Sequence, residues 1–268
     1  MKKSKKFSGL INDLKWFIEK RLLLFFLVEI IRVSLLFFGK KIRGKIIELL
    51  KIEEIRGIIN YNSLKIIIRF MDVGNFKEIF EWNVYGESFK RRKVIVDVGA
   101  HIGLFTIKHA RNTEKIVAIE PNPKNFNILE ENLKINDIKN VEMLNVAISN
   151  RKGYSFLYGS GGSASIVKTS TNEKYTIKLT TLDNICKYLK SIDLMKIDVE
   201  GAEELVLRGG KNTLEKVKKI VMEVHPNLVK EEKIIDLLSR RGFKIKRLPS
   251  WVEGTFILLC EKKKKDNI

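Results

Sequence analysis

The stretch VIVDVGAHIGLFTIKHA, which runs from Val94 to Ala110, decides the fold of this chain. It opens with residues suited to a buried strand, passes Gly99 and Gly103, and continues with apolar residues at helical spacing. Glycine lets a chain turn sharply and lets a ligand approach the backbone. The stretch therefore predicts a strand, a tight turn and a helix, with room for a ligand at the end of the strand.

The same alternation of strand and helix continues toward the C-terminus. Short apolar runs predict strands at Val94–Val98, Ile116–Glu120, Val141–Val146, Leu194–Asp198 and Ile220–Val224. Two later segments are expected to close the sheet as an antiparallel pair, GFKIKRLP (242–249) and GTFILLCEK (254–262). Strands that alternate with helices predict an α/β fold whose mainly parallel sheet is covered by helices on both faces.

The chain is expected to divide near residue 92, into a mainly helical region, 1–92, and an α/β domain, 93–268. In the first region, apolar positions from Ile42 to Ile59 favour helix, SLKIIIRF (63–70) favours a strand, and NFKEIFEWNVY (75–85) favours a short amphipathic helix. A Gly-, Ser- and Thr-rich insertion, 158–180, separates the third and fourth strands. It is either a substrate-binding lid or a β-hairpin without a role.

The composition excludes several classes of protein. With 268 residues and 44% hydrophobic side chains, the chain can form a sizeable core. Its two cysteines, Cys186 and Cys260, lie far apart, which argues against a disulfide scaffold or a zinc knuckle and favours a reducing, cytoplasmic compartment. The formal net charge of +19 favours anionic partners such as lipid head groups, nucleic acid or an acidic substrate. A lysine-rich composition alone would produce the same charge.

The positive charge is densest near the N-terminus. Residues 1–45 carry 12 basic and 3 acidic side chains and include the apolar segment RLLLFFLVEIIRVSLLFFGK (21–40). Two internal charges make this segment a poor membrane span, and no small-residue cleavage site follows to indicate a signal peptide. Two interpretations stay open: a helix in the interface of an anionic membrane, at its inner face, or a helix that packs on protein.

The loop after the first predicted strand favours a ligand without phosphates. Open parallel sheets bind ligands beyond the carboxyl ends of their strands, which here bear Asp97, Gly99, Ala100, His101 and Gly103. The spacing of these glycines is neither the Gly-x-Gly-x-x-Gly of a pyrophosphate loop nor the pattern of a P-loop. An acidic Asp97 would also repel phosphates.

Glu120 follows the second strand, at a place where an acidic side chain can accept hydrogen bonds from two ribose hydroxyls. An adenosine cofactor with a free ribose and no phosphate satisfies both patterns. S-adenosylmethionine is such a cofactor, and its positive ammonium and sulfonium groups suit a site that contains Asp97 and Glu120. NAD shares the ribose contact and stays open, although the loop spacing disfavours it.

Further polar residues follow the fourth and fifth strands. MKIDVEGAEELVLRGG (195–210) places Asp198 and Glu200 at the same edge, where with Lys196 they could orient the cofactor, bind a cation or act as a base. Capping of the next helix is the alternative role. His225 is either a base near neutral pH or a turn histidine. Asp198, Glu200 and His225 are our catalytic candidates. Because no set of His, Cys and carboxylate residues has zinc spacing, no metal site is predicted.

These motifs resemble the FkbM family of S-adenosylmethionine-dependent methyltransferases. The family's motifs occur here in order as VIVDVGAHIGLFT, VAIEPNPKNFNILEENLKIN, NVAIS, TLDNI and MKIDVEGAEELVLRGG. The resemblance covers roughly Val94 to His225, and its most specific parts are residues 120–123 and 196–203. It implies a class I methyltransferase fold, which is Rossmann-like and has seven strands.

The resemblance also implies positions for the cofactor. The loop residues Asp97, Gly99, Ala100, His101 and Gly103 would surround its methionine part, although the family usually has asparagine in place of His101. The ribose and adenine would be held by Glu120, Pro121, Asn122, Asn145, Val146 and Ala147, and Asp198 would border the cofactor and the acceptor. Family members generally methylate oxygen, often a hydroxyl of a sugar or natural product. We therefore expect a small-molecule or glycan acceptor, such as a sugar, a glycan or a lipid-linked metabolite.

Three other functions stay open. An NAD-dependent oxidoreductase would need the pyrophosphate loop that this chain lacks. A nucleic-acid-binding protein without catalysis would rest on the charge of +19, but the sequence has no recognised nucleic-acid module or aromatic stacking platform. An RNA methyltransferase would combine the cofactor site with the charge, and it is the alternative to a sugar methyltransferase.

Overall fold

The computed structural model describes residues 25, 27, 28, 30, 31, 55–86, 90–159, 165–166, 174–250 and 254–262. By its internal contacts the chain divides into two compact units, Met1–Gly74 and Asn75–Ile268. This division groups residues 75–92 with the α/β domain, whereas the sequence pattern grouped them with the helical region.

The first unit contains an antiparallel hairpin of strands β1 (Arg56–Tyr61) and β2 (Leu64–Arg69). Asn62 and Ser63 form its two-residue turn, with φ angles of 44° and 65°. Positive φ at both central residues matches the right-handed twist of a hairpin, and it allows the apolar run before the turn to pair with the run after it. The strand predicted over 63–70 is thus confirmed. The helix predicted from Ile42 to Ile59 is wrong at its end, which β1 occupies, and its part over 42–54 lies outside the described residues.

A buried ion pair ends the hairpin. The Arg69 side chain donates to Asp72 at 2.8 Å, and the chain continues through a short turn, Phe70–Asp72, into helix α4 (Val73–Phe76). The aromatic ring of Phe25, from a helical segment near the N-terminus, packs edge-on against Phe70. Most of the apolar segment 21–40 lies outside the described residues. Among the helices that are described, none is long and apolar enough to cross a membrane.

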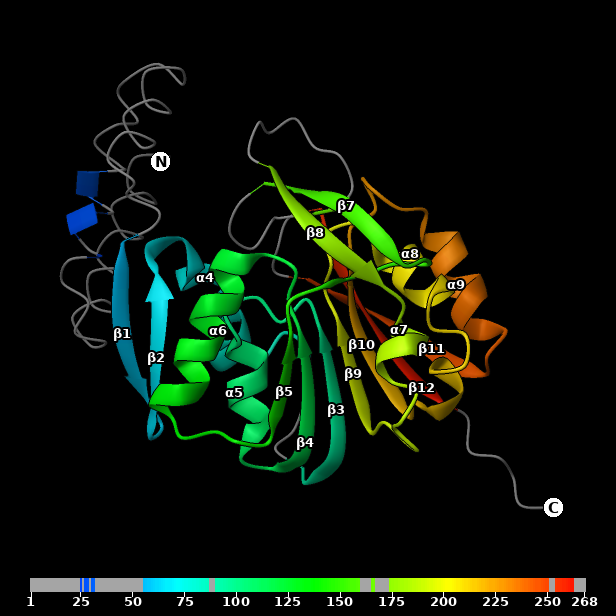
Figure 1. The fold of residues 1–268 in the computed structure, drawn as a ribbon, viewed down its shortest axis with the longest axis horizontal. Coiled ribbons are helices and arrows are strands. Elements are labelled where there is room, and N and C mark those ends of the chain that lie inside the picture. The colour runs from blue at the N-terminus through cyan, green and yellow to red at the C-terminus, as the bar shows by residue number, and fades with distance from the viewer. Residues whose placement is uncertain are drawn as a thin grey trace, which may run out of the picture. The chain divides into compact units, whose positions relative to one another are not determined.

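The second unit is built on a seven-stranded sheet (Figure 1). Its strands are β3 (Arg92–Val98), β4 (Thr113–Ile119), β5 (Val141–Leu144), β9 (Leu194–Ile197), β10 (Lys219–Val224), β11 (Phe243–Pro249) and β12 (Phe256–Lys262). They lie in the order β11-β12-β10-β9-β3-β4-β5. The five strands from β10 to β5 run parallel, whereas β12 runs antiparallel to β10 and β11. The predicted mainly parallel sheet with an antiparallel closing strand is confirmed.

Helices cover the sheet because its strands are apolar on both faces. On one face, strand residues such as Val96 and Met222 form a core cluster with buried residues of helices α7, α8 and α9, for example Leu182 and Ile234. The helices of this unit are α5 (Leu104–Ala110), α6 (Pro123–Ile135), α7 (Leu182–Ile185), α8 (Glu203–Arg208) and α9 (Glu231–Ser239), with one-turn segments at Lys77–Glu81 and Leu214–Lys216. The predicted helical character of 75–85 is confirmed by the turn at 77–81.

The insertion between β5 and β9 forms a small sheet of its own. Strands β6 (Ala147–Ile148), β7 (Gly153–Tyr158) and β8 (Lys174–Thr180) pair in the order β6-β8-β7. A hairpin, one of the two expectations for 158–180, is thus present, but its first strand, β7, ends where the predicted insertion begins. Alternation along β7 and β8 buries Leu157 and Ile177 in a small core and leaves Tyr154 exposed. Ser165, between the two strands, donates its hydroxyl to the backbone carbonyl of Glu200, which brings the insertion to the end of β9.

Candidate active site

The candidate site lies where four parallel strands end. Strands β4, β3, β9 and β10 are neighbours, so their carboxyl ends meet at one edge of the sheet (Figure 1). The predicted site residues follow these ends, apart from Asp97, which lies within β3 one residue before its end, and Asn145, Val146 and Ala147, which follow β5. The parallel register of the sheet therefore brings segments together that are about 100 residues apart in the chain.

The two loop glycines face protein atoms. Gly99 has a φ of +80°, and a Cβ atom there would lie 1.8 Å from the carbonyl oxygen of Asp198. Gly103 has a φ of +86°, and its Cβ would lie 2.4 Å from a side-chain carbon of Leu129 on α6. Each glycine is therefore required by the close approach of another part of the chain. Contact with a ligand is not the only reason for this spacing.

His101 adopts a left-handed conformation, with a φ of 55°. Asparagine and histidine tolerate this region better than most residues with a side chain. This backbone requirement explains why histidine can stand where the family usually has asparagine. It also turns the amide N–H of His101 toward Glu120, whose Oε2 accepts it at 2.8 Å.

Glu120 is held mainly by backbone donors. Its Oε1 accepts the amide of Asn122 at 2.9 Å and the side-chain amide of Asn125 at 3.3 Å. The residue is 5% exposed. Burial raises the pKa of Glu120 to about 7, although the hydrogen bonds from Asn122 and His101 favour its charged form. The carboxylate of Glu120 thus joins the loop after β3 to the start of α6. The position of Glu120 in the sequence did not indicate this role.

Two asparagines organise the backbone around this carboxylate. The side chain of Asn122 accepts the amide of Lys124 and caps α6. The Asn145 side chain donates to the carbonyls of Glu120 and Pro121, at 2.8 and 3.1 Å. Val146 and Ala147 follow, partly buried and buried, and Ala147 begins β6.

A buried lysine connects the loop to the end of β9. Asp97 and Lys196 are partners in the parallel register of β3 and β9, and their charged groups lie 3.4 Å apart. The Lys196 Nζ also donates to the carbonyl of Gly99 at 2.5 Å and lies 3.5 Å from Asp198. Asp97, fully buried, accepts the hydroxyl of Thr106 on α5 at 2.7 Å. Asp97 and Lys196 thus form a buried ion pair that connects β3 to β9 at this edge.

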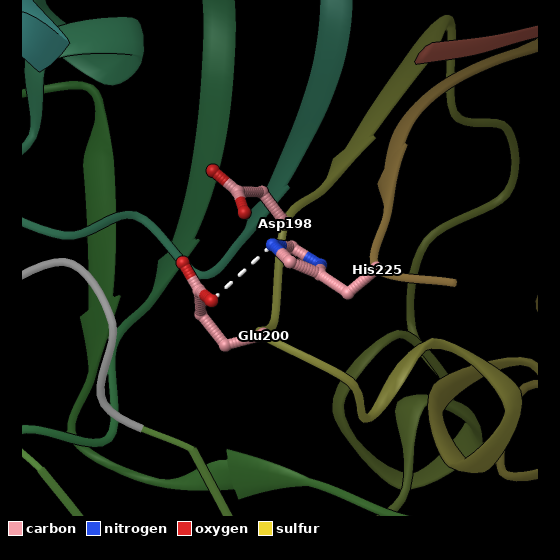
Figure 2. Close-up of side chains that lie close together, drawn as sticks. All are labelled: Asp198, Glu200 and His225. Atoms are coloured by element: carbon pink, nitrogen blue, oxygen red, sulfur yellow. Dashed lines mark ion pairs between the residues drawn. The ribbon is translucent and has the colours of Figure 1, made fainter. Parts of the chain in front are cut away.

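The three catalytic candidates converge on one point (Figure 2). One ligand-type atom from each of Asp198, Glu200 and His225 lies within 4.8 Å of the others. The Nε2 of His225 lies 3.2 Å from a carboxylate oxygen of Glu200. Glu200 has a φ of 51°, a left-handed conformation that is strained for a glutamate. The sequence correctly placed all three residues at one edge, and only the structure places their side chains in contact.

Three further residues of this cluster were not predicted as site residues. Glu203, fully buried at the start of α8, accepts from the Nδ1 of His225 at 2.7 Å and from the amide of Gly201 at 3.1 Å. Tyr85 donates its hydroxyl to Asp198 at 3.1 Å. Glu223 accepts the hydroxyl of Thr255 at 2.7 Å. The series of acids Asp-x-Glu-x-x-Glu in 198–203 could have drawn attention to Glu203, but no local pattern pointed to Tyr85.

The crowding of acids changes their protonation. Burial raises the pKa of Glu200 to about 8, and repulsion by Asp198 acts in the same direction. The pKa of Glu223 rises to about 7, again through burial and then Asp198. Burial alone would lower the pKa of His225, but its bond to Glu203 and the attraction of Glu200 raise it to about 9. The cluster therefore favours bound protons, or another source of positive charge.

The excess positive charge of the chain has one concentration at the opposite edge of the sheet. A cavity of about 820 Å³ opens there, next to the start of β3. Basic residues dominate its lining, which consists of Lys90, Arg91, Arg92, Lys93, Val94, Glu114, Lys190, Ser191, Asp193 and Lys218. The net charge is thus a poor guide to the chemistry of the acidic edge.

Several known methyltransferases are similar to this chain in sequence. Residues 97–245 match the methyltransferase FkbM domain. The methyltransferase sdnD of Sordaria araneosa is 28% identical over 70% of this chain and 88% of its own length. The hexuronic acid methyltransferase AglP of Haloferax volcanii is 30% identical over 57% of this chain and 64% of its own length. The 2-O-methyltransferase NoeI of Sinorhizobium fredii is 28% identical over 62% of this chain and 78% of its own length.

A solved structure supports the same assignment at the level of the fold. The crystal structure of the methyltransferase FkbM from Methylobacillus flagellatus superposes with a TM-score of 0.50 and 16% identity, over 69% of this chain. This chain spans 47% of that protein's length. The matched domain covers more than half of the present chain, including the loop after β3 and the cluster at the ends of β9 and β10. The chain therefore belongs to the FkbM family of S-adenosylmethionine-dependent methyltransferases.

Proposed function

We propose that this protein transfers a methyl group from S-adenosylmethionine to a hydroxyl oxygen of a sugar, in particular of an acidic sugar or glycan. Two of its relatives carry names that state related activities, a hexuronic acid methyltransferase and a 2-O-methyltransferase. The observation that carries the proposal is the acidic edge of the sheet. Asp198, Glu200 and His225 converge there beside the loop that begins at Gly99.

The residues at this edge fit a positively charged nucleoside. Glu120 keeps acceptor capacity beyond its bonds to the loop, since a carboxylate has about four lone-pair sites and three donors contact it. Additional hydrogen bonds from ribose hydroxyls would stabilise its charged form, which burial disfavours. Asp198 and Glu200 would offset the positive charge near the methionine part. Asn145, Val146 and Ala147 would border the adenine.

When bound, S-adenosylmethionine supplies a methyl group on a sulfonium, and the electrons of the broken carbon–sulfur bond stay on sulfur. The protein's task is to align the acceptor oxygen with that methyl group and to exclude water. The acceptor hydroxyl must also lose its proton, and Asp198, Glu200 and His225 are the groups at hand. Lys196 lies within 3.5 Å of the carboxylates of Asp97 and Asp198 and donates to the carbonyl of Gly99. It thereby fixes the loop after β3 relative to the end of β9.

A pair of variants tests the assignment of roles. We expect Glu120→Ala to abolish S-adenosylmethionine binding, and Glu200→Ala to retain binding while methyl transfer slows by roughly 100-fold, a typical contribution of acid–base catalysis. Isothermal calorimetry measures binding, and transfer of labelled methyl groups measures turnover. Glu142→Gln is the control, because Glu142 belongs to an ion pair with Lys115 elsewhere on the sheet. Equal cofactor affinity in wild type and Glu120→Ala would contradict the ribose assignment.

The acceptor class can be tested in the same assay. The purified protein is incubated with methyl-labelled S-adenosylmethionine and, separately, with uronic-acid-containing oligosaccharides, neutral oligosaccharides and RNA. We expect label in the oligosaccharides, with the acidic ones preferred. Label in RNA alone would support the RNA methyltransferase alternative instead.

A second proposal concerns residues 1–45, most of which lie outside the described residues. We propose that their basic and apolar side chains hold the enzyme at an anionic membrane surface. Sedimentation with anionic vesicles should then carry down the full chain but not a chain that begins at residue 46. Equal sedimentation of both chains would refute this contact.

A further inference from the structure

We propose that Asp198, Glu200 and His225 form a binding site for a divalent cation, which holds the methyl acceptor by two neighbouring oxygens. The proposal departs from the expectation of no metal, which rested on zinc spacing in the sequence. Sequence spacing could not reveal this set, because His225 reaches the two carboxylates from a different strand.

The first argument is the geometry of the donor atoms. Donors that lie about 2.1 Å from one ion are about 3 Å apart when adjacent and about 4.2 Å apart when opposite. The donor atoms of the three residues all lie within 4.8 Å of one another, so side-chain movements without a change of the backbone would bring them to one ion. All three residues are partly accessible, which leaves coordination positions for an acceptor.

The second argument is the orientation of the histidine ring. The Oε1 of the fully buried Glu203 lies 2.7 Å from the Nδ1 of His225. The other ring nitrogen, Nε2, points toward Glu200 (Figure 2). A carboxylate that accepts from one ring nitrogen while the other faces a metal is the usual support of a histidine ligand. The same arrangement disfavours His225 among the three candidate bases, since a carboxylate oxygen already lies within 3.2 Å of each of its ring nitrogens.

The third argument is the balance of charge. Asp198, Glu200, Glu203 and Glu223 follow or end two adjacent strands, and Lys196 and His225 are the cationic side chains that contact members of this group among the described residues. Lys196 already serves Asp97 and the carbonyl of Gly99. A divalent cation would supply the missing positive charge. Two carboxylates and one imidazole are a mixed oxygen and nitrogen set, which suits Mn²⁺ or Mg²⁺ better than the thiolate-binding metals.

The role of this cation rests on the proposed function, whereas its binding does not. A bound cation lowers the pKa of a hydroxyl that coordinates it, so the proton can leave to solvent water. The acceptor oxygen then uses a lone pair to form the new carbon–oxygen bond, as the bond between the methyl carbon and sulfur breaks. An acceptor with two adjacent oxygens, such as vicinal hydroxyls of a sugar ring, would be favoured because it chelates the ion.

Binding of Mn²⁺ tests the site directly. The full chain is freed of metals with EDTA and titrated with Mn²⁺, and the free ion is followed by electron paramagnetic resonance. We expect one Mn²⁺ per chain, binding at least 10-fold weaker in Glu200→Gln and Asp198→Asn, and about 10-fold weaker in Glu203→Gln, which releases the ring without removing a ligand. Glu142→Gln, an exposed acidic residue elsewhere, should bind as the wild type does.

Thermal unfolding of each variant shows whether it is folded, and unfolded variants are replaced by His225→Gln. Absence of Mn²⁺ binding in the wild type, or equal affinity in wild type and Glu200→Gln, would overturn the proposal. Calorimetry with S-adenosylmethionine in EDTA separates it from the proposed function. Cofactor binding with methyl transfer that persists in EDTA would refute the cation but keep the enzyme. Mn²⁺ binding without cofactor binding would keep the site and refute the enzyme.

Discussion

The end of β4 and the ends of β9 and β10 differ in how they stabilise buried carboxylates. Both regions bury carboxylates at one edge of a parallel sheet. At the end of β4, Glu120 is surrounded by hydrogen-bond donors, two of them backbone amides. At the ends of β9 and β10, Asp198, Glu200 and His225 converge (Figure 2), and Glu203 contacts the other nitrogen of the His225 ring.

The difference shows which region is complete without a ligand. Backbone amides are fixed in place by the fold, so the contacts of Glu120 cost no side-chain ordering beyond its own. At the ends of β9 and β10, burial first and then repulsion by the neighbouring Asp198 raise the pKa of Glu200 to about 8. The carboxylate at the end of β4 is therefore stabilised by the protein itself. The carboxylates at the ends of β9 and β10 would be stabilised further by any bound positive charge.

The largest expected effect comes from the residue that joins the two regions. Gly99→Ala would place a Cβ 1.8 Å from the Asp198 carbonyl oxygen at a φ of +80°, so the loop and β9 could not keep their distance. We expect destabilisation of roughly 4 kcal/mol or more, seen as a loss of folded protein or a fall in Tm of about 10 °C. Gly74→Ala is the control, because no atom lies within 4 Å of its Cβ position. An unchanged Tm in Gly99→Ala would show that the two regions are not rigidly connected.

A smaller effect is expected on the pH dependence of stability in metal-free protein. The pKa of Glu200 is raised in the folded state, so stability falls as pH rises from about 4.5 to about 8. The pKa of His225 is also raised, so its contribution is complete below about pH 6.5 and is lost as pH rises through about 9. The wild-type Tm should therefore fall between pH 5 and pH 9.

Substitution of Glu200 sharpens this prediction. In Glu200→Gln the fall in Tm should be smaller by several degrees, because the amide stays neutral, while the raised pKa values of Glu120 and Glu223 preserve part of it. Differential scanning calorimetry at pH 5 and pH 9 measures both curves. If Tm falls by the same amount between pH 5 and pH 9 in the variant and the wild type, the crowded acids are not the source of the pH dependence.

The smallest effect concerns Tyr85, whose hydroxyl donates a hydrogen bond to Asp198. Tyr85→Phe removes the hydrogen bond to Asp198, a contribution of about 1 kcal/mol, so methyl transfer should slow about 5-fold with unchanged affinity for S-adenosylmethionine. Tyr188→Phe, which removes an exposed hydrogen bond to Glu142, is the matched control. A loss of 100-fold or more would mean that the phenol takes part in the chemistry.

Much of the fold could be predicted because its causes are local. The strands of the sheet read as short apolar runs, and their observed bounds differ from the predicted ones by a few residues, as in Arg92–Val98 against Val94–Val98. The end of the predicted helix at Ile59 failed because an apolar run fits either element, and the turn at Asn62 and Ser63 makes it a strand. The edge that carries the candidate site was predictable as well, because it lies at the carboxyl ends of strands that can be recognised from the sequence.

The sequence by itself determined the parallel sheet, the edge that carries the site and the family, since each depends on short-range order of residues. The tertiary structure alone decided which side chains meet there. Asp97 pairs with Lys196 across 99 positions of the chain, and Tyr85 contacts Asp198 across 113. Such contacts depend on strand register and on side-chain direction, which no spacing within one segment encodes.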